Sequence, residues 1–181
     1  MALTADATLY TDHPAAGRAG LEAARAIAML SYRSYQTYQK SQGEFMQEKL
    51  DNFRASSYQR YQGEKLWKRF DPLAYLALAK AMDSHNVGRG RNGVSAALRQ
   101  IKAATLVVGI QSDLLFPIEE QILLADQIPN AFLTIIDSIY GHDGFLVEAR
   151  VITEKLEQFL KGEMRSKRIV AVPGLPGTET F

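Results

Sequence analysis

Ala131-Phe-Leu-Thr-Ile-Ile-Asp137 is a β-type run that predicts a buried strand, and it leads into the turn Ser138-Ile-Tyr-Gly-His142-Asp143-Gly144. A long amphipathic helix to Leu160 is expected next. Its apolar stripe consists of Phe145, Ala149, Ile152, Leu156 and Phe159. A histidine on a glycine-bracketed turn between strand and helix lies where open α/β sheets place their chemistry. We therefore interpret His142 as the general base of an enzyme.

A second strand is predicted upstream, at Ala104–Ile110, because this β-branched run is short and bounded by turn residues. A helix from Ile118 to about Ile128 should connect the two strands, and Pro129 should end it. Two parallel strands cannot form a stable doubly wound sheet, which needs several strands covered on both faces. The remaining strands are expected to come from a segment that precedes this chain.

The residues before this block predict helices. One should run from Gly20 to about Tyr38, and residues 44–69 look helical again. Asp71-Pro72 is a strong helix start, because aspartate caps free backbone N–H groups and proline suits the first helical position. The resulting helix at 73–83 is apolar nearly all round, so we expect both of its sides to be buried. The predicted organisation is a leader loop at 1–19, a helical block at 20–100, an α/β block at 101–163 and a disordered tail at 164–181.

Composition narrows the function classes. The chain has 181 residues with a net charge of +1, which gives no electrostatic case for nucleic acid or an anionic membrane. It has no cysteine, so it offers no disulfide, thiolate metal site or cysteine nucleophile. No apolar run approaches the roughly 20 residues of a membrane helix, and the first residues lack the pattern of a secretion signal. The histidines lack metal-ligand spacing, so we predict no metal. The lack of cysteine agrees with a reducing compartment, and we predict a cytoplasmic protein.

Asp113 is the expected partner of His142. Both follow a predicted strand, 29 residues apart, on the same edge of the sheet. An aspartate that accepts a hydrogen bond from one ring nitrogen leaves the other free to take a proton, and acid before histidine is the α/β-hydrolase order. A structural turn histidine beside an unrelated aspartate is the alternative. The chain lacks the Gly-x-Ser-x-Gly nucleophile motif, and Ser95 in Gly93-Val-Ser95-Ala-Ala97 does not replace it.

Several motifs resemble the homoserine O-acetyltransferase family. Gly20-Leu-Glu-Ala-Ala-Arg25-Ala-Ile-Ala-Met-Leu-Ser-Tyr32-Arg-Ser34 resembles the start of that family's helical lid, and Arg69-Phe-Asp-Pro-Leu-Ala-Tyr75 a later part of it. Val108-Gly-Ile-Gln-Ser-Asp113-Leu-Leu-Phe-Pro117 resembles the family's acid loop, and Tyr140-Gly-His-Asp-Gly-Phe-Leu146 its histidine loop. The resemblance is collinear over about residues 14–162. It implies a partial α/β-hydrolase fold: a lid and the last two parallel core strands with their helices.

The resemblance implies acyl transfer from acetyl-CoA to the hydroxyl of L-homoserine, a step of methionine biosynthesis. His142 would be the base and Asp113 its partner, while Arg25, Tyr32 and Asp143 would hold homoserine. Acetyl-CoA is then a donor substrate, and no cofactor is expected. Arg25 and Tyr32 are seven residues apart, which places them on one helix face. The alternatives are a solvated arginine, a packing tyrosine and an aspartate that caps the final helix.

The missing N-terminal half should carry the nucleophilic serine, so we expect this chain alone to be inactive. Members of the family pair through their lids, which implies a homodimer. Two further readings stay open: another α/β-hydrolase, such as a serine or homoserine O-succinyltransferase or an esterase, and an inactive truncated product that self-associates through its lid. The loop at Gly88–Gly93 could meet CoA phosphates, although a plain connection between helices is favoured.

Overall fold

The computed structural model describes residues 1–164, which form two compact units. The helical unit comprises residues 1–86 and 139–143, and the sheet unit comprises residues 87–138 and the described residues from 144 onward. The predicted domain boundaries stay predictions. The predicted disordered tail at 164–181 lies, apart from its first residue, outside the described residues.

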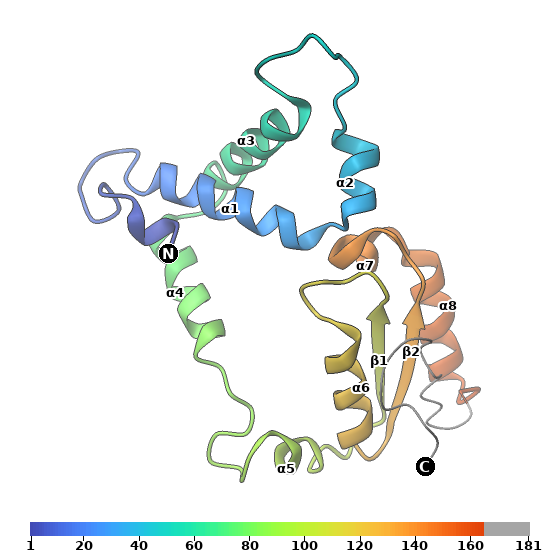
Figure 1. The fold of residues 1–181 in the computed structure, drawn as a ribbon. Helices are drawn as coiled ribbons and strands as arrows, with labels where there is room; N and C mark the ends of the chain where they lie inside the picture. Colours follow the sequence, from blue (N-terminus) through green and yellow to red (C-terminus); the bar gives the residue numbers. More distant parts are fainter. Residues whose placement is uncertain (165–181) are drawn as a thin grey trace. The chain divides into compact units, whose positions relative to one another are not determined.

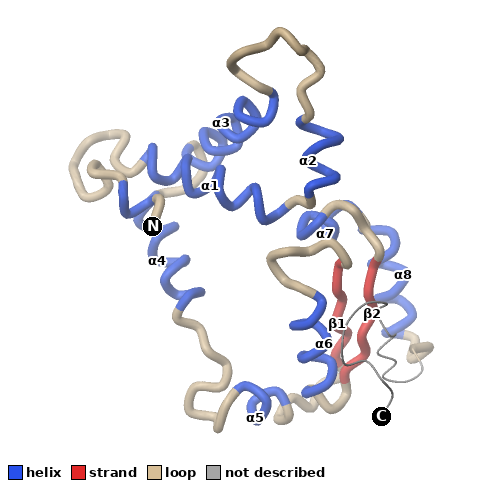
Figure 2. Tube along the Cα trace, viewed as in Figure 1, coloured by secondary structure: helices blue, strands red, loops and turns tan. Residues whose placement is uncertain are grey.

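The first 86 residues fold into helices (Figures 1 and 2). Helices α1 and α3 pack so closely at Gly63 that a Cβ there would lie 2.9 Å from the Glu22 carbonyl oxygen. Buried leucines at positions 3, 9 and 21 form the core of this unit with partly buried side chains at the end of α3 and beyond. The elements are η1 (Leu3–Ala5), α1 (Arg18–Tyr32), α2 (Tyr35–Gln42), α3 (Arg54–Trp67) and α4 (Pro72–Asp83).

The helix predicted from Gly20 to Tyr38 is two helices. The backbone is extended at Arg33 and Ser34, and α2 begins at Tyr35. The Ser34 hydroxyl accepts a hydrogen bond from the Thr37 backbone N–H at 3.2 Å, which makes Ser34 the N-cap of α2. This local cap ends one helix and starts the next, whereas hydrophobic periodicity alone had predicted a continuous helix.

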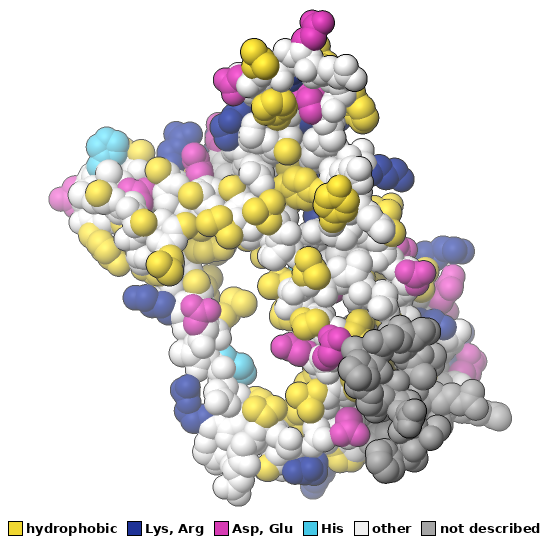
Figure 3. Space-filling view, viewed as in Figure 1, with side chains coloured by type: hydrophobic (Ala, Val, Ile, Leu, Met, Phe, Trp, Pro, Cys, Tyr) yellow, Lys and Arg dark blue, Asp and Glu magenta, His cyan; other side chains and the backbone are white. Residues whose placement is uncertain are grey.

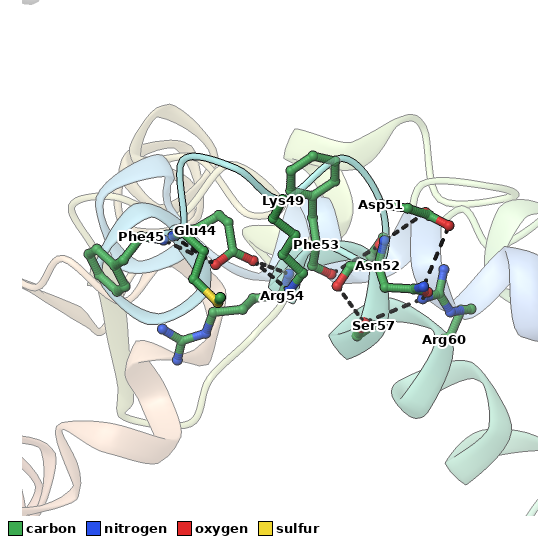
Figure 4. A network of polar contacts seen from close by, with 11 residues as sticks. Glu44, Phe45, Lys49, Asp51, Asn52, Phe53, Arg54, Ser57 and Arg60 are labelled. Carbon is green, nitrogen blue, oxygen red and sulfur yellow. Dashed lines mark hydrogen bonds and ion pairs between the residues drawn. The ribbon is translucent and has the colours of Figure 1, made fainter.

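The helix predicted over residues 44–69 begins only at Arg54, because the preceding segment forms a loop around one carboxylate (Figure 4). Glu44 accepts hydrogen bonds from Lys49 Nζ at 2.8 Å and from the Arg54 N–H at 3.3 Å. The pKa of the Glu44 carboxyl falls to about 2, first of all because of the Lys49 hydrogen bond. Polar contacts within the loop thus replace the helix that its composition predicted.

Helix α4 starts as predicted but is less buried than expected. Asp71 Oδ1 accepts a hydrogen bond from the Ala74 N–H at 2.7 Å, and Pro72 occupies the first turn. However, Leu73, Leu78 and Met82 are exposed, so the prediction that both sides of this helix are buried is wrong for the described residues. Figure 3 shows further exposed hydrophobic side chains over the helical unit.

The sheet unit contains the two predicted strands, and they pair in parallel. Strand β1 (Thr105–Ile110) is bonded to β2 (Ala131–Ile136) with Thr105 opposite Ala131 and Ile110 opposite Ile136. Helix α6 (Ile118–Gln127) connects the two strands. Helix α5 (Val94–Leu98) precedes β1 in the chain. The confirmed pairing means that the loops after β1 and β2 leave the same edge of the sheet.

Opposite faces of this two-stranded sheet are covered by different helices. Ala131 and Val107 pack with Ala125 and Ile128 at α6. The neighbouring residue Phe132 points to the other face and meets Phe159 of α8 with ring centroids 5.7 Å apart. The layers α6, sheet and α8 form a partial α/β-hydrolase arrangement (Figure 1).

The long helix predicted after the histidine turn is interrupted. It consists of α7 (Gly144–Val147) and α8 (Ala149–Leu160), separated at Glu148, whose backbone angles (φ −86°, ψ 31°) leave the helical region. Among residues 1–164, no helix is long and apolar enough to cross a membrane.

Candidate functional site

The predicted base lies on a turn that is bound to the helical unit. We call Ile139–Asp143 the histidine turn and Tyr32–Thr37 the α1–α2 corner. Within the turn, Gly141–Asp143 form the 3-10 helix η2. The Thr37 hydroxyl donates to the Ile139 carbonyl oxygen at 2.7 Å, and the Ser34 hydroxyl also donates to that oxygen. Two side chains of the corner therefore fix the start of the turn.

Gly141 allows the turn to approach this corner. Its φ is +65°, a left-handed conformation that glycine adopts at little cost. A Cβ at this position would lie 2.7 Å from the Ser34 nitrogen and 3.0 Å from the Tyr32 carbonyl oxygen. Backbone thus packs directly on backbone, which requires a glycine immediately before the predicted base.

Three of the predicted site residues are linked by contacts of the Tyr32 ring in the helical unit. The ring centroids of Tyr32 and His142 are 5.5 Å apart, with an angle of 52° between the ring planes. The Arg25 guanidinium carbon lies 5.4 Å from the centroid of the Tyr32 ring, within the range of a cation–π contact. The seven-residue spacing of Arg25 and Tyr32 therefore does place them side by side on α1, and the Tyr32 ring also contacts His142, the predicted base.

Arg25 also lines a cavity of about 130 Å³. The other lining residues come from the end of α3 and just beyond it, and most of them can donate hydrogen bonds. They are Gln62, Lys65, Leu66 and Arg69. With three cationic side chains and no acidic one in the lining, the cavity is suited to an anionic group such as a carboxylate.

Asp143, the predicted ligand for an ammonium group, is held by an arginine that the sequence analysis assigned no role. Arg33 Nε donates a hydrogen bond to Asp143 Oδ2 at 3.1 Å. The guanidinium carbon of Arg33 also lies 5.0 Å from the centroid of the Tyr58 ring on α3. These residues are far apart in sequence, so spacing gives no signal for the contact. The signal that was present is the position of Arg33 directly after Tyr32, at the end of a helix.

Asp113 lies in the loop after β1 in the sheet unit and is buried. Its Oδ1 accepts hydrogen bonds from the N–H groups of Leu115 and Phe116, at 2.8 and 2.9 Å. These bonds shape the loop that follows the strand. Because Asp113 belongs to the sheet unit and His142 to the helical unit, their pairing stays a prediction.

The loops that follow the two strands are nevertheless tied together within the sheet unit. The Gln111 N–H donates to the Ile136 carbonyl oxygen at 2.9 Å, and the Ser112 hydroxyl donates to the Ser138 carbonyl oxygen at 2.6 Å. Ser112 immediately precedes Asp113, and Ser138 immediately precedes the histidine turn. The expectation that both loops leave one sheet edge and meet is confirmed up to these two residues.

The weaker candidates take other positions. Ser95 lies in the first turn of α5, which follows a loop and not a strand. The loop at Gly88–Gly93 closes on itself, because the N–H groups of Arg91 and Gly93 both donate to the Gly88 carbonyl oxygen. Among residues 1–164, no group of three or more potential acidic, histidine or cysteine ligands gathers, and the absence of a metal stays a prediction.

Sequence comparison relates the chain to named enzymes. It is 47% identical over 161 residues to a homoserine O-acetyltransferase of Cyclobacterium marinum, covering 89% of this chain and 44% of that protein. A homoserine O-acetyltransferase of Mycolicibacterium smegmatis is 42% identical over 159 residues, covering 83% of this chain and 42% of that protein. The chain is a homologue of the homoserine O-acetyltransferases. It spans less than half the length of these relatives, and no family model matches it.

Solved structures of homoserine O-acetyltransferases and of an acetylester hydrolase resemble the fold of this chain. A homoserine O-acetyltransferase from Staphylococcus aureus is 30% identical with a TM-score of 0.65, covering 84% of this chain and 44% of that one. The enzyme from Bacillus anthracis has a TM-score of 0.78 at 19% identity, covering 92% and 47%. An acetylester hydrolase from Corynebacterium glutamicum has a TM-score of 0.73 at 21% identity, covering 88% and 47%. At those two lower identities the likeness supports the α/β-hydrolase fold alone.

Proposed function

We propose that this chain forms the lid and the last two core strands of a homoserine O-acetyltransferase, which moves the acetyl group of acetyl-CoA to the hydroxyl of L-homoserine. The single observation that supports this best is the pair of contacts made by the Tyr32 ring. The ring lies against the Arg25 guanidinium and against the ring of His142, the proposed base. Homoserine is a small zwitterion with a hydroxyl at its far end. A site for it needs a cation, an anion and a base within a short distance.

In the proposed mechanism His142 serves two half-reactions. A serine on the N-terminal segment gives its proton to His142 and attacks the thioester carbonyl. The tetrahedral intermediate collapses to the acetyl-serine, and CoA leaves as the thiol with the proton from His142. The homoserine hydroxyl then gives its proton to His142 and attacks the acetyl-serine. Collapse releases O-acetylhomoserine, and the serine oxygen regains the proton.

Asp113 orients this base in the proposal. A buried carboxylate that accepts the N–H of one ring nitrogen selects the tautomer whose other nitrogen is free, and it stabilises the imidazolium that forms. The burial of Asp113 and the two backbone bonds to its Oδ1 fit this role, because they hold the carboxylate in one orientation.

Arg25 and Asp143 bind the two charged groups of homoserine. The guanidinium of Arg25, next to the basic cavity, takes the carboxylate through paired hydrogen bonds. Asp143 takes the ammonium group. Tyr32 contacts both Arg25 and His142, and in the proposal its side chain contacts the acceptor. The acceptor is thereby held at both ends, which is how a bimolecular transfer becomes effectively unimolecular.

An acetyl esterase is the second candidate function, because hydrolases of this class share the fold. Water would then replace homoserine as the acceptor, and Arg25 would have no carboxylate to bind. A succinyl donor or a serine acceptor would keep the same base and change only the pocket. The remaining alternative is an inactive product that self-associates. It differs from the other candidates because it would stay inactive when a serine-bearing N-terminal half is supplied.

The lid is also the proposed surface for a homodimer in the cytoplasm. Apolar side chains on α1 and α4 are exposed, and a second lid would cover them (Figure 3). They are Ile27, Leu30, Leu73, Leu78 and Met82. Sedimentation of the chain should show dimers that Leu78→Glu converts to monomers, whereas dimers that persist would place the interface elsewhere.

The proposed function is tested in a chimaera. In the Cyclobacterium marinum relative, the segment that matches this chain is replaced by this chain. The remainder of the relative supplies the serine-bearing half. The chimaera should release CoA thiol from acetyl-CoA beyond about one equivalent per enzyme only when L-homoserine is present, because the acetyl-serine must pass its acetyl group on before a second turnover. His142→Ala should abolish that release. A folded chimaera that hydrolyses acetyl esters and ignores homoserine would contradict the proposal. The 181-residue chain alone should show no turnover.

A further inference from the structure

We propose that Arg33 is a positioning residue for the acceptor's ammonium group: it holds one oxygen of Asp143 and leaves the other to the substrate. The inference rests on the proposed function, because it assigns a role to a residue beside the same site. Its physical basis is an ion pair at the α1–α2 corner that neither local helix geometry nor helix capping requires.

The ion pair is one-sided. Arg33 Nε donates to Asp143 Oδ2 at 3.1 Å, while within residues 1–164 no hydrogen bond reaches Asp143 Oδ1. A carboxylate can accept about four hydrogen bonds over its two oxygens. The free oxygen therefore retains its capacity for a second donor, and an ammonium group has three N–H bonds to offer.

The arginine is itself fixed from a second direction. Its guanidinium carbon lies 5.0 Å from the centroid of the Tyr58 ring, so the Arg33 side chain is held between α3 and the histidine turn. The side chains of Arg33 and Asp143 are only 23% and 24% exposed. At that exposure solvent screens the pair less than it screens a surface ion pair, which makes the orientation of the carboxylate well defined.

The backbone around the pair is equally constrained. Arg33 lies between Tyr32, which touches the His142 ring, and Ser34, which binds the Ile139 carbonyl oxygen. Asp143 directly follows His142. One corner of the lid thus sets the positions of the base and of the carboxylate beside it, and Arg33 is its only cation bonded to the histidine turn among residues 1–164.

The direction in which removal of Arg33 changes homoserine binding distinguishes two possible roles of this residue. If Arg33 only competed with the substrate for Asp143, its removal would strengthen binding of homoserine. If it positions Asp143, its removal frees the carboxylate to adopt other rotamers, and binding of the ammonium group weakens. The two possibilities predict opposite changes in the KM for homoserine.

The kinetic test uses the complete enzyme described above, with L-homoserine and with 4-hydroxybutyrate, an acceptor that keeps the carboxylate and hydroxyl but lacks the ammonium group. Arg33→Gln should raise the KM for homoserine about tenfold or more, the scale of one hydrogen bond to a charged group. It should leave the KM for 4-hydroxybutyrate nearly unchanged, and Arg33→Lys should restore part of the preference. Arg18→Gln, which removes an exposed pair with Glu22 on the same helix, is the matched control.

A second measurement uses the 181-residue chain and needs no activity. In ¹⁵N spectra the Arg33 Nε–H signal should be protected from exchange with water, and it should shift and lose that protection in Asp143→Asn. A signal that exchanges rapidly and ignores Asp143→Asn would overturn the inference, as would an equal rise of both KM values or a fall in the KM for homoserine. Complete inactivity of the unmodified enzyme with homoserine would instead refute the proposed function, while the spectra would still decide whether Arg33 holds Asp143.

Discussion

The ring of Tyr32 lies 5.5 Å from the ring of His142, centroid to centroid, across 110 residues of sequence. This contact joins the last residue of α1 to the predicted base. Helix α1 therefore carries both Arg25, the proposed binding partner of the acceptor's carboxylate, and a direct neighbour of the predicted base. In the proposed function, acceptor binding and proton transfer would therefore both depend on α1.

Replacing Tyr32 by leucine in the complete enzyme should lower kcat/KM for homoserine by about two- to tenfold, because a ring–ring contact contributes roughly 0.5–1.5 kcal/mol beyond its burial. Tyr32→Phe keeps the ring and removes the hydroxyl. Steady-state kinetics of both variants separate packing from hydrogen bonding. If leucine has no effect, the Tyr32 ring does not support the base.

Replacing Arg25 by glutamine should raise the KM for homoserine about tenfold or more, since a charge-assisted hydrogen bond to the acceptor carboxylate is lost. Hydrolysis of a simple acetyl ester by the same variant should change little, because that substrate has no carboxylate. Kinetics with the two substrates give the comparison. Equal losses on both would indicate that Arg25 supports the lid and does not bind the acceptor.

Replacing Gly141 by alanine should lower the free energy of unfolding by about 2 kcal/mol or more, because left-handed strain of about 1–2 kcal/mol adds to the contact 2.7 Å from the Ser34 nitrogen. Gly162→Ala is the matched control, since Gly162 has a φ of +68° but open space around the position of a Cβ. Urea unfolding of the 181-residue chain measures both. The close approach is refuted if the two variants lose the same stability.

The Glu44 loop predicts a pH dependence of stability. The folded-state pKa of Glu44 is lowered to about 2 from its ordinary value of 4.5, so its stabilising contribution is complete above about pH 4.5. That contribution disappears as the pH falls from 4.5 towards 2. Glu44→Gln should therefore flatten this part of the stability curve, measured by chemical unfolding from pH 6 to pH 2. Lys49→Met, which removes the donor of the principal hydrogen bond, should have the same effect.

The regular elements could largely be predicted from the sequence, since their causes are local. The β-branched run at 105–110 and the Asp71-Pro72 helix start each carry their signal within a few residues. The division of the first helix at Arg33 and the loop before Arg54 were missed. In both places side-chain caps and carboxylate hydrogen bonds outweigh the hydrophobic periodicity on which the helix predictions relied.

The candidate site could be predicted only in part, for the opposite reason. Arg25 and Tyr32 share a helix face, so spacing alone places them together. The Arg33–Asp143 ion pair and the Ser112–Ser138 hydrogen bond join residues that are far apart along the chain, and no local pattern indicates them. The pairing of Asp113 with His142 remains a prediction from strand order and resemblance.

The histidine turn belongs with residues 1–86, although the chain on either side of it belongs to the sheet unit. A protease that cut within residues 87–93 would therefore sever the helical segment from the turn covalently, while the hydroxyl groups of Ser34 and Thr37 still held Ile139. Co-elution of the two cleaved pieces from a size-exclusion column would show that residues 1–86 still bind the turn that carries His142.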